Sequence, residues 1–266
     1  MGISADEFPE LPTVQGGFNI EMDRKLLNDM VKQTIFAVAV TDQKVVYTGI
    51  KFEIGNGEIR LVSVDGFRMA IRTEKIDYNG EDITFIVPAK TMSEIMKLSL
   101  EDSEDEESLI SIGVGKRHII FEVNGYSVIS RLLEGEFLNY KATIPVSVAT
   151  TVEVDTKSLI DSIERTSLII TDRTKSLISC VFDTDFIRIS SITSIGTAND
   201  KVPADIEGNR VEIGFNNRYL LDALKACNTD RVKIQLNGSV SPILILPTEG
   251  ESFIFLVLPV RLKKND

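Results

Sequence analysis

The chain has 266 residues, of which 43% are hydrophobic and only 8 are proline, so it can form two domains with hydrophobic cores and does not resemble a disordered protein. No window approaches the ~18–20 consecutive apolar residues of a membrane span, and the acidic, proline-containing N-terminus does not resemble a secretory signal. We therefore expect a soluble, cytoplasmic protein with no membrane partner. The net charge of −11 argues against a nucleic-acid partner, but six carboxylates fall within the single run 101–108 and bias that total.

Four segments carry apolar residues every three or four positions, which is the spacing of an amphipathic helix. In chain order, the predicted helices cover residues 23–34, 89–98, 156–167 and 217–227. Short runs rich in β-branched and aromatic residues lie between them and predict strands. These strands are expected over residues 57–64, 67–73, 83–87, 118–123, 186–191, 211–215, 231–236, 243–247 and 253–260.

The order of these elements repeats along the chain. Residues 20–25 are echoed by 152–157 at an offset of 132, and residues 59–61 are echoed by 187–189 at an offset of 128. The second predicted helix is matched by the fourth, again at an offset of 128. We therefore predict an α+β fold of two tandem domains, each a duplicated unit of helix and antiparallel sheet, with a boundary near residues 144–147.

Basic residues recur seven positions apart on three of the predicted helices, and seven residues return to nearly the same helix face. With one lysine of the third helix, these candidates are Lys25, Lys32, Lys90, Lys97, Lys157, Arg218 and Lys225. If the helices line one surface, such a stripe suits the phosphate backbone of DNA without reading its sequence. The alternative is that these side chains are the ordinary solvated surface of any helix.

Catalytic motifs are missing from the sequence. The one histidine, His118, falls within a predicted strand, and no serine or cysteine triad, zinc motif or phosphate-binding loop is present. Asp65-Gly66 is typical of a hairpin turn or a bulge rather than of a metal ligand, and Cys180 within an apolar run is expected to be buried. We predict neither an enzyme nor a cofactor, although a metal-dependent nuclease with ligands from distant strands stays open.

Four stretches carry a resemblance to a known family. Residues 62–70, 133–140 and 255–262 resemble the motifs T-D-G-H-R-L-A, G-x-F-P-D-Y and M-P-M-R-L of the bacterial DNA polymerase III beta subunit, and residues 213–220 match a fourth motif. The whole chain resembles the second and third domains of this sliding-clamp family. The resemblance assigns residues 1–12 to a linker, 13–145 to the second domain and 146–266 to the third.

The resemblance implies a non-catalytic processivity factor of bacterial chromosomal replication. In the family, two subunits of three domains form a head-to-tail ring around duplex DNA, with helices lining the hole and sheets on the rim. The basic helix faces would then look toward phosphates. Clamps capture the replicative polymerase, the clamp loader and repair proteins through short peptides with a Gln and a terminal Leu-Phe pair.

The peptide pocket of the family lies between its second and third domains, and the matching positions can be carried over. The first half would supply Tyr47, Val64, Gly66, Phe67, Arg68, Met69, Leu138, Ala142 and Thr143. The second half would supply Asn216, Tyr219, Val240, Pro242, Leu256, Val257, Leu258, Pro259, Val260 and Arg261. Val64, Met69, Leu138 and Leu258 could form an apolar hole for a peptide anchor.

Some positions depart from the family pattern. Phe67 stands where the family has His, Leu138 where it has Pro, Ala142 where Arg is common, and Pro242 where a small polar residue is frequent. The subsite near Leu138 and Ala142 is therefore expected to have its own preferences.

The first domain of the family has no counterpart in this chain. In the ring it meets the third domain of the other subunit, on a side that would include Ile169 and Ile170. We expect a chain without it to keep the pocket but to be a monomer or weak oligomer that cannot close a ring. Two other readings stay open: a repeat-built interaction protein without a DNA role, and the nuclease.

Overall fold

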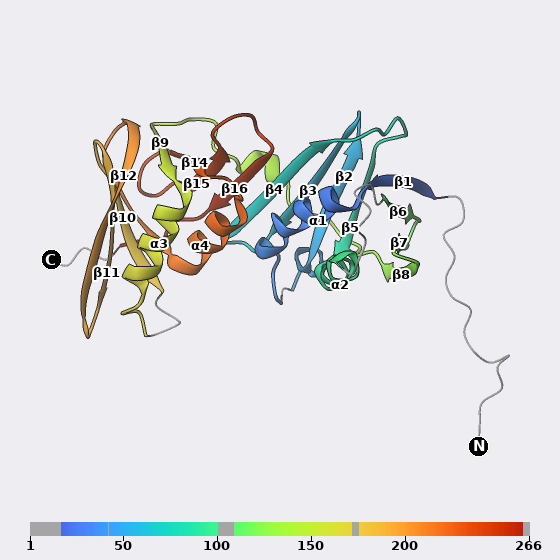
Figure 1. Cartoon of the computed structure of the whole chain (residues 1–266), viewed down its shortest axis with the longest axis horizontal. Coiled ribbons are helices and arrows are strands. Elements are labelled where there is room, and N and C mark those ends of the chain that lie inside the picture. Colours follow the sequence, from blue (N-terminus) through green and yellow to red (C-terminus); the bar gives the residue numbers. More distant parts are fainter. Residues whose placement is uncertain (1–16, 42, 101–108, 172–175, 263–266) are drawn as a thin grey trace, which may run out of the picture.

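A computed structural model describes residues 17–41, 43–100, 109–171 and 176–262 (Figure 1). The expected linker over residues 1–12 and the acidic run 101–108 lie outside the described residues. The first half contains β1 (Phe18–Asp23), α1 (Arg24–Lys32), β2 (Gly49–Gly55), β3 (Glu58–Val64), β4 (Arg68–Lys75), β5 (Ile83–Pro88), α2 (Ala89–Leu100), β6 (Leu109–Val114), β7 (His118–Val123) and β8 (Tyr126–Arg131). The second half contains β9 (Thr150–Asp155), α3 (Thr156–Ser167), β10 (Leu177–Phe182), β11 (Phe186–Thr193), β12 (Gly196–Gly208), β13 (Val211–Asn216), α4 (Asn217–Ala226), β14 (Arg231–Leu236), β15 (Ile243–Pro247) and β16 (Phe253–Val257).

The order strand, helix, three strands occurs four times, so each half is a duplicated unit and the predicted α+β repeat is confirmed. Individual hydrogen bonds repeat at the same offsets. The hydroxyls of Thr34 and Thr166 each donate to a carbonyl oxygen one helical turn earlier, at 2.9 Å in both halves. The hydroxyls of Ser63 and Ser191 then donate to the carbonyl oxygens of those two threonines.

The strands form two antiparallel sheets. One has the order β1-β6-β7-β8, and the other has the order β13-β10-β11-β12-β9-β14-β15-β16-β4-β3-β2-β5. Each half contains two units of strand, helix and three strands, and the first strand of one unit pairs with a strand of the other. In the first half, β1 pairs with β6 and β5 pairs with β2. The long strand β12 pairs with β11 through residues 196–203 and with β9 through residues 204–208.

The two halves are joined through one continuous sheet. β16 of the second half pairs with β4 of the first, with Leu256 opposite Met69. On the helix side, the Gln33 amide nitrogen donates to the carbonyl oxygens of Ala226 and Cys227, each at 3.1 Å, where α4 ends. Backbone pairing and side-chain contacts therefore both cross the boundary.

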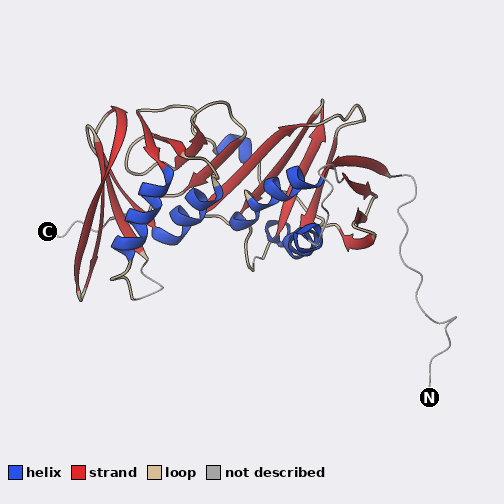
Figure 2. Cartoon of the chain, viewed as in Figure 1, coloured by secondary structure: helices blue, strands red, loops and turns tan. Residues whose placement is uncertain are grey.

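The helices cover one side of the sheets and are arranged in a row (Figure 2). α1 packs against α2, and α3 packs against α4. Each half has its own core, with Leu27 and Phe52 in the first and Leu224 and Phe255 in the second. Burying such a side chain stabilises the fold by about 1.5–3 kcal/mol, so these two cores are the main reason the sheets and helices stay together.

The predicted helices agree with the observed helices to within two residues at every end, and Cys180 is buried as expected. The strand predicted over 253–260 is wrong in its last part. Pro259 has no N–H, and beyond Val257 the chain leaves β15: Leu258 N donates to Phe67 O at 2.9 Å and Val260 N to Gly214 O at 2.8 Å. No helix in the described ranges is long and apolar enough to cross a membrane.

Candidate functional site

The turn between β3 and β4 is held by an aspartate. Asp65 Oδ1 accepts from the backbone N–H groups of Phe67 at 2.9 Å and Arg68 at 3.0 Å. Gly66 has φ of +87°, a left-handed conformation that favours glycine, so the Asp-Gly pair is a turn as predicted. This turn leaves the Phe67 side chain 57% exposed to solvent.

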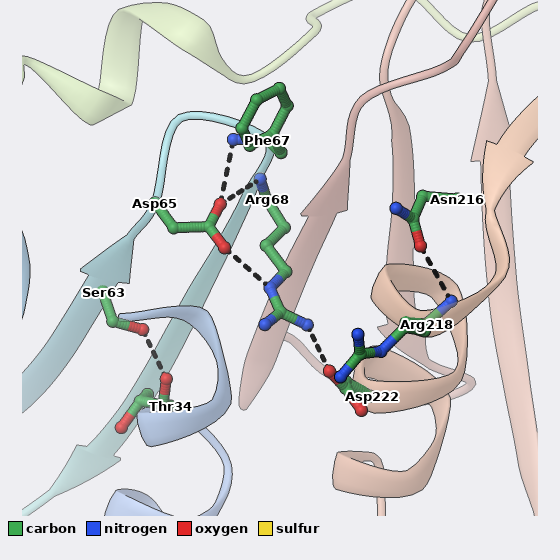
Figure 3. Close-up of polar contacts among 8 residues, drawn as sticks. All are labelled: Thr34, Ser63, Asp65, Phe67, Arg68, Asn216, Arg218 and Asp222. Carbon is green, nitrogen blue, oxygen red and sulfur yellow. Dashed lines mark hydrogen bonds and ion pairs between the residues drawn. The ribbon is translucent and has the colours of Figure 1, made fainter. Parts of the chain in front are cut away.

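Arg68 links the two halves from just beyond that turn (Figure 3). Its Nε lies 2.9 Å from Asp65 Oδ2, and its Nη1 lies 2.5 Å from Asp222 Oδ2 on α4. Its guanidinium carbon lies 4.7 Å from the ring centroid of Tyr219. Because the Arg68 side chain is only 12% exposed, these charge-assisted bonds are little screened and fix the turn against α4.

An apolar patch gathers where the halves meet. The rings of Phe67 and Tyr219 stack with centroids 5.6 Å apart and planes 22° apart. Leu258, 37% exposed, lies beside them because its backbone N–H donates to Phe67 O. We call Phe67, Tyr219 and Leu258 the junction patch, and its three members come from the β3–β4 turn, α4 and the segment after β16.

Val64 and Met69, which were expected to line an apolar hole for a peptide anchor, are buried instead of exposed at the surface. With Leu256 they belong to a buried cluster over the β4–β16 pairing, and Val64 is 6% exposed. Tyr47 packs against this cluster, and its ring meets the Phe137 ring edge-on at 5.5 Å. The buried cluster therefore forms a floor, and the exposed apolar surface comes from the junction patch and from Leu138.

Asn216 and Gly214 have structural tasks. Asn216 is the N-cap of α4, and its Oδ1 accepts from Arg218 N at 3.0 Å, which leaves its amide nitrogen as the group that can face a ligand (Figure 3). A Cβ on Gly214 would lie 2.6 Å from the carbonyl oxygen of Val260. Glycine there allows the segment after β16 to approach β13.

The remaining predicted pocket residues differ in how far they are exposed to solvent. Gly66, Ala142, Thr143, Val240, Val260 and Arg261 are exposed, Pro242 and Pro259 are half-buried, and Val257 is fully buried. Within the described residues, no hydrogen bond or ring contact joins Leu138, Ala142, Val240 or Pro242 to the junction patch. The structure therefore brings predicted pocket residues of the β3–β4 turn, α4 and the segment after β16 together at the junction patch.

Two residues of the junction were missed by the sequence interpretation. Asp222 is the α4 partner of Arg68, and Phe36 lies with its ring centroid 5.4 Å from the Arg68 guanidinium carbon and packs edge-on against Phe255. No sequence signal pairs Arg68 with Asp222, which is 154 residues away. Phe36 lies two residues beyond the predicted helix 23–34 and outside every predicted element.

One hollow of about 670 Å³ lies on the opposite side of the junction sheet from the helices, with Arg60, Ile71, Tyr140 and Ile254 among its lining residues. Its lining includes none of the predicted pocket residues. It also carries charges of both signs, including Glu58 and Arg60, which pair at 3.8 Å. This hollow therefore does not coincide with the predicted peptide site.

The seven basic residues predicted to face DNA are all exposed on the helix row. Four of them form ion pairs: Lys32 with Asp29, Lys97 with Glu94, Lys157 with Asp161 and Lys225 with Glu164. The four helices together carry nine basic and five acidic residues, a net charge of +4 in a chain of net charge −11. The helix row is therefore positive relative to the rest of the protein.

Ile169 and Ile170, expected at a ring interface, are both half-buried, and Ile170 packs against the core of the second half. Their neighbour Leu168 is 80% exposed. No group of three or more His, Cys, Asp or Glu side chains that could hold a metal ion occurs in the part of the chain that the structure describes.

Comparison with known proteins identifies the family. Residues 21–139 match the central domain of the DNA polymerase III beta subunit, and residues 141–261 match its C-terminal domain. The beta sliding clamp of Staphylococcus aureus strain Mu50 is 30% identical over 98% of this chain and 68% of its own length. The chain belongs to the DNA polymerase III beta subunit family, the sliding clamps.

Solved clamp structures have the same fold. A sliding clamp from Bacillus subtilis matches with a TM-score of 0.92 and 28% identity, over 98% of this chain and 69% of that one. A putative DNA polymerase III beta subunit from Eubacterium rectale matches with a TM-score of 0.90 and 31% identity, over 98% and 70%. Sliding clamps are non-catalytic processivity factors of replication, so the nuclease interpretation and the interpretation without a DNA role are set aside.

Proposed function

We propose that this clamp chain captures its partners at the junction patch. The ligands are short peptides with a Gln and a terminal Leu-Phe pair, carried by the replicative polymerase, the clamp loader and repair proteins of a bacterial cytoplasm. The observation that carries the proposal is the apolar junction patch, in which Phe67 and Leu258 are exposed, Tyr219 is half-buried, and both halves contribute.

The chemistry of the patch suits such peptides. Apolar anchors near the centre of an interface contribute most of its binding energy, and Phe67 and Leu258 offer that contact to a Leu or Phe side chain. The ion pairs of Arg68 hold the turn and α4 together before any ligand arrives, which lowers the entropy lost on binding. The Asn216 amide nitrogen supplies a donor for a Gln side chain.

We also propose that the chain divides into clamp domains over residues 13–145 and 146–266, and that the helix row faces duplex DNA in an assembled clamp. The net +4 charge of the helices supports that orientation. Contacts with phosphates alone carry no sequence information, so this surface would permit sliding.

Calorimetric titration with a Gln-containing, Leu-Phe-ending peptide tests the peptide site. We expect saturable binding in the micromolar range, near about −8 kcal/mol. A peptide with Ala in place of the Leu-Phe pair should not bind, because its apolar anchors are gone. Failure of the first peptide to bind a folded sample would refute the proposed site.

Leu258→Asp locates the site on the protein. A carboxylate in the junction patch should abolish peptide binding, since burying it without a partner is unfavourable. The fold should survive because Leu258 is an exposed residue outside the three cores. Val146→Asp, a fully exposed position in the connection between the halves, is the matched control and should bind normally. Equal affinity in Leu258→Asp and the control would place the site elsewhere.

A further inference from the structure

The hollow of about 670 Å³ and the junction patch are connected along the pairing of β4 with β16, which lie side by side (Figure 1). Met69 is opposite Leu256 directly beyond the patch, and Ile71 is opposite Ile254 two residues further along. Alternate side chains of a strand point to the same face, so these four side chains face the same way. They belong to one apolar cluster, and Ile71 and Ile254 also line the hollow. One apolar cluster therefore extends from beneath the patch to the hollow.

The segment that connects the two halves forms one wall of the hollow. Tyr140 and Ile144 pack in the same apolar cluster, while Lys141 between them is exposed. The Tyr140 hydroxyl donates to Glu53 Oε2 at 2.7 Å, and the same carboxylate oxygen lies 3.6 Å from Arg60 Nη1. These contacts hold the wall against the sheet, so the hollow exists before a ligand binds. Its volume of about 670 Å³ is within the range of ligand-binding sites.

The hollow has unpaired positive charge to offer a ligand. Two of its three carboxylates, Glu58 and Glu74, already pair with arginines. Among the described residues, Lys75 and Lys141 form no ion pair, and of the lining carboxylates there only Glu251 forms none. Both lysines are exposed. Two unpaired lysines against one unpaired carboxylate favour an acidic ligand, because charges of opposite sign across an interface select the partner.

The proposed peptide site fixes the direction in which a partner chain reaches the hollow. Beyond Leu258, the chain leads to Val260, whose N–H donates to the carbonyl oxygen of Gly214, two residues before Asn216 on β13. The hollow lies in the other direction, back along β16 at Ile254. A peptide with its Gln at Asn216 and its Leu-Phe pair on the junction patch therefore directs the residues that follow the pair toward the hollow.

We propose that the hollow binds an acidic segment that follows the Leu-Phe pair in partners whose chain continues beyond it. The inference rests on the proposed peptide site and adds a second part to it. Leu258 and Ser252 are six residues apart, about 20 Å at ~3.3 Å per residue, so about six extended residues of a partner span the same distance. An apolar side chain of this segment packs on the two isoleucines of the β4–β16 pairing, and its carboxylates meet Lys75 and Lys141.

Calorimetric titration with a set of matched peptides tests the proposal. The core peptide contains Gln and ends at the Leu-Phe pair. A second peptide adds about six residues with one isoleucine and two terminal glutamates, and a third has glutamines in place of those glutamates. The acidic peptide should bind about fivefold more tightly than the glutamine peptide, as expected for two exposed ion pairs. Equal affinity of the acidic and glutamine peptides would overturn the proposal.

Salt separates charge pairing from apolar contact. The advantage of the acidic peptide over the glutamine peptide should vanish at about 0.5 M salt, because exposed charges are screened there. The affinity of the core peptide should change much less, since its anchors are apolar. An advantage of the acidic peptide that is the same at low and high salt would contradict binding through the two lysines.

Variants of the two lysines locate the acidic segment on the protein. Lys75→Gln with Lys141→Gln should remove the advantage of the acidic peptide and leave the affinity of the core peptide unchanged. Lys90→Gln with Lys116→Gln removes the same charge from exposed positions outside the hollow and is the matched control, which should keep the advantage. An advantage that survives in the first variant, or that is lost in the control, would overturn the proposal.

A cross-link reports the place of the extension directly. Glu251→Cys, at an exposed position of the hollow, should form a disulfide with an acidic peptide that carries cysteine at its last position, while both native cysteines are buried. Lys116→Cys, exposed between β6 and β7, is the control and should react far less. Equal yields from the two variants would place the extension elsewhere.

The two proposals fail in different ways. If the core peptide binds and the acidic extension adds no affinity, the peptide site stands and the hollow is not its continuation. If neither the core peptide nor the extended peptides bind a folded sample, the peptide site is wrong and the inference about the hollow is wrong with it.

Discussion

Tyr140, the last residue of the stretch 133–140, is a buried side chain with a charged partner. Its hydroxyl donates to Glu53 Oε2 at 2.7 Å across 87 residues of sequence. Burial and the Glu53 carboxylate raise the pKa of Tyr140 to about 12. Burial also acts to raise the pKa of Glu53, but hydrogen bonds from Lys51 and Tyr140 outweigh it and leave that pKa lowered.

Tyr140→Phe should lower the free energy of unfolding at pH 7 by about 1–2 kcal/mol, because it removes a hydrogen bond to a charged group. The neutral phenol is favoured in the folded state, so its contribution is complete below the unfolded pKa near 10 and is lost as the pH rises through about 12. Denaturant unfolding of both proteins from pH 7 to about 11.5 measures this. The difference should shrink above about pH 10.

Tyr126→Phe, at an exposed position in β8, is the control and should change the free energy of unfolding by less than ~0.5 kcal/mol. A difference between Tyr140→Phe and the wild type that stays constant up to about pH 11.5 would contradict a raised Tyr140 pKa.

Among the elements, α1 and α3 begin in the same way. Asp23 and Asp155 are their N-caps, and each carboxylate accepts from the backbone N–H three residues later, at 2.6 and 2.7 Å. The hydrogen bonds from Ser158, side chain and backbone, hold the pKa of Asp155 below its usual value. The echo of residues 20–25 in 152–157 is therefore the repeat of a strand end and a helix cap.

Asp155→Ala should lower the free energy of unfolding by about 1 kcal/mol at pH 7, because α3 loses its cap. Asp155→Asn keeps an oxygen acceptor and should cost only a few tenths. Because the carboxylate has a lowered pKa, its extra contribution is present above the unfolded pKa and is lost as the pH falls through the folded pKa. Urea unfolding at pH 7 and pH 3 measures both effects, and equal loss in the two variants at pH 7 would argue against capping.

At the scale of the whole molecule, we expect this acidic chain to meet DNA through its row of helices. Lys25→Glu with Lys90→Glu should weaken attraction to duplex DNA. The logarithm of the DNA-binding constant falls as the logarithm of the salt concentration rises. This dependence should become shallower by about 0.9 for each phosphate that the protein no longer neutralises. Fluorescence anisotropy at about 20–200 mM salt, with two unrelated duplexes, measures the slope. The wild type should bind both duplexes alike, since phosphate contacts carry no sequence information.

Lys75→Glu, at an exposed position at the end of β4, lines the hollow on the side away from the helices and is the matched control. It makes the same charge change as either one of the two helix substitutions but should affect DNA attraction much less than that single substitution. An effect of Lys75→Glu equal to that of Lys25→Glu alone would show that total charge, rather than the helix row, governs the attraction.

The sequence by itself determined the four helices, the tandem repeat, the turn at Asp65-Gly66, the burial of Cys180 and, through its ordered motifs, the family. These features depend on neighbours in the chain: apolar spacing, cap residues and turn chemistry are local. Strands such as β8 and β12 were not predicted from the sequence. Their side chains are largely polar or exposed, so they lack a clear alternating apolar pattern.

Only the tertiary structure decided how the halves meet. The pairing of β16 with β4, the link from Arg68 to Asp222 and the stacking of Phe67 on Tyr219 join residues more than 150 positions apart. The same packing buried Val64 and Met69 beneath the junction patch and ended the last strand at Val257. Such contacts depend on which surfaces two folded halves present to each other, and no local pattern in the chain encodes that choice.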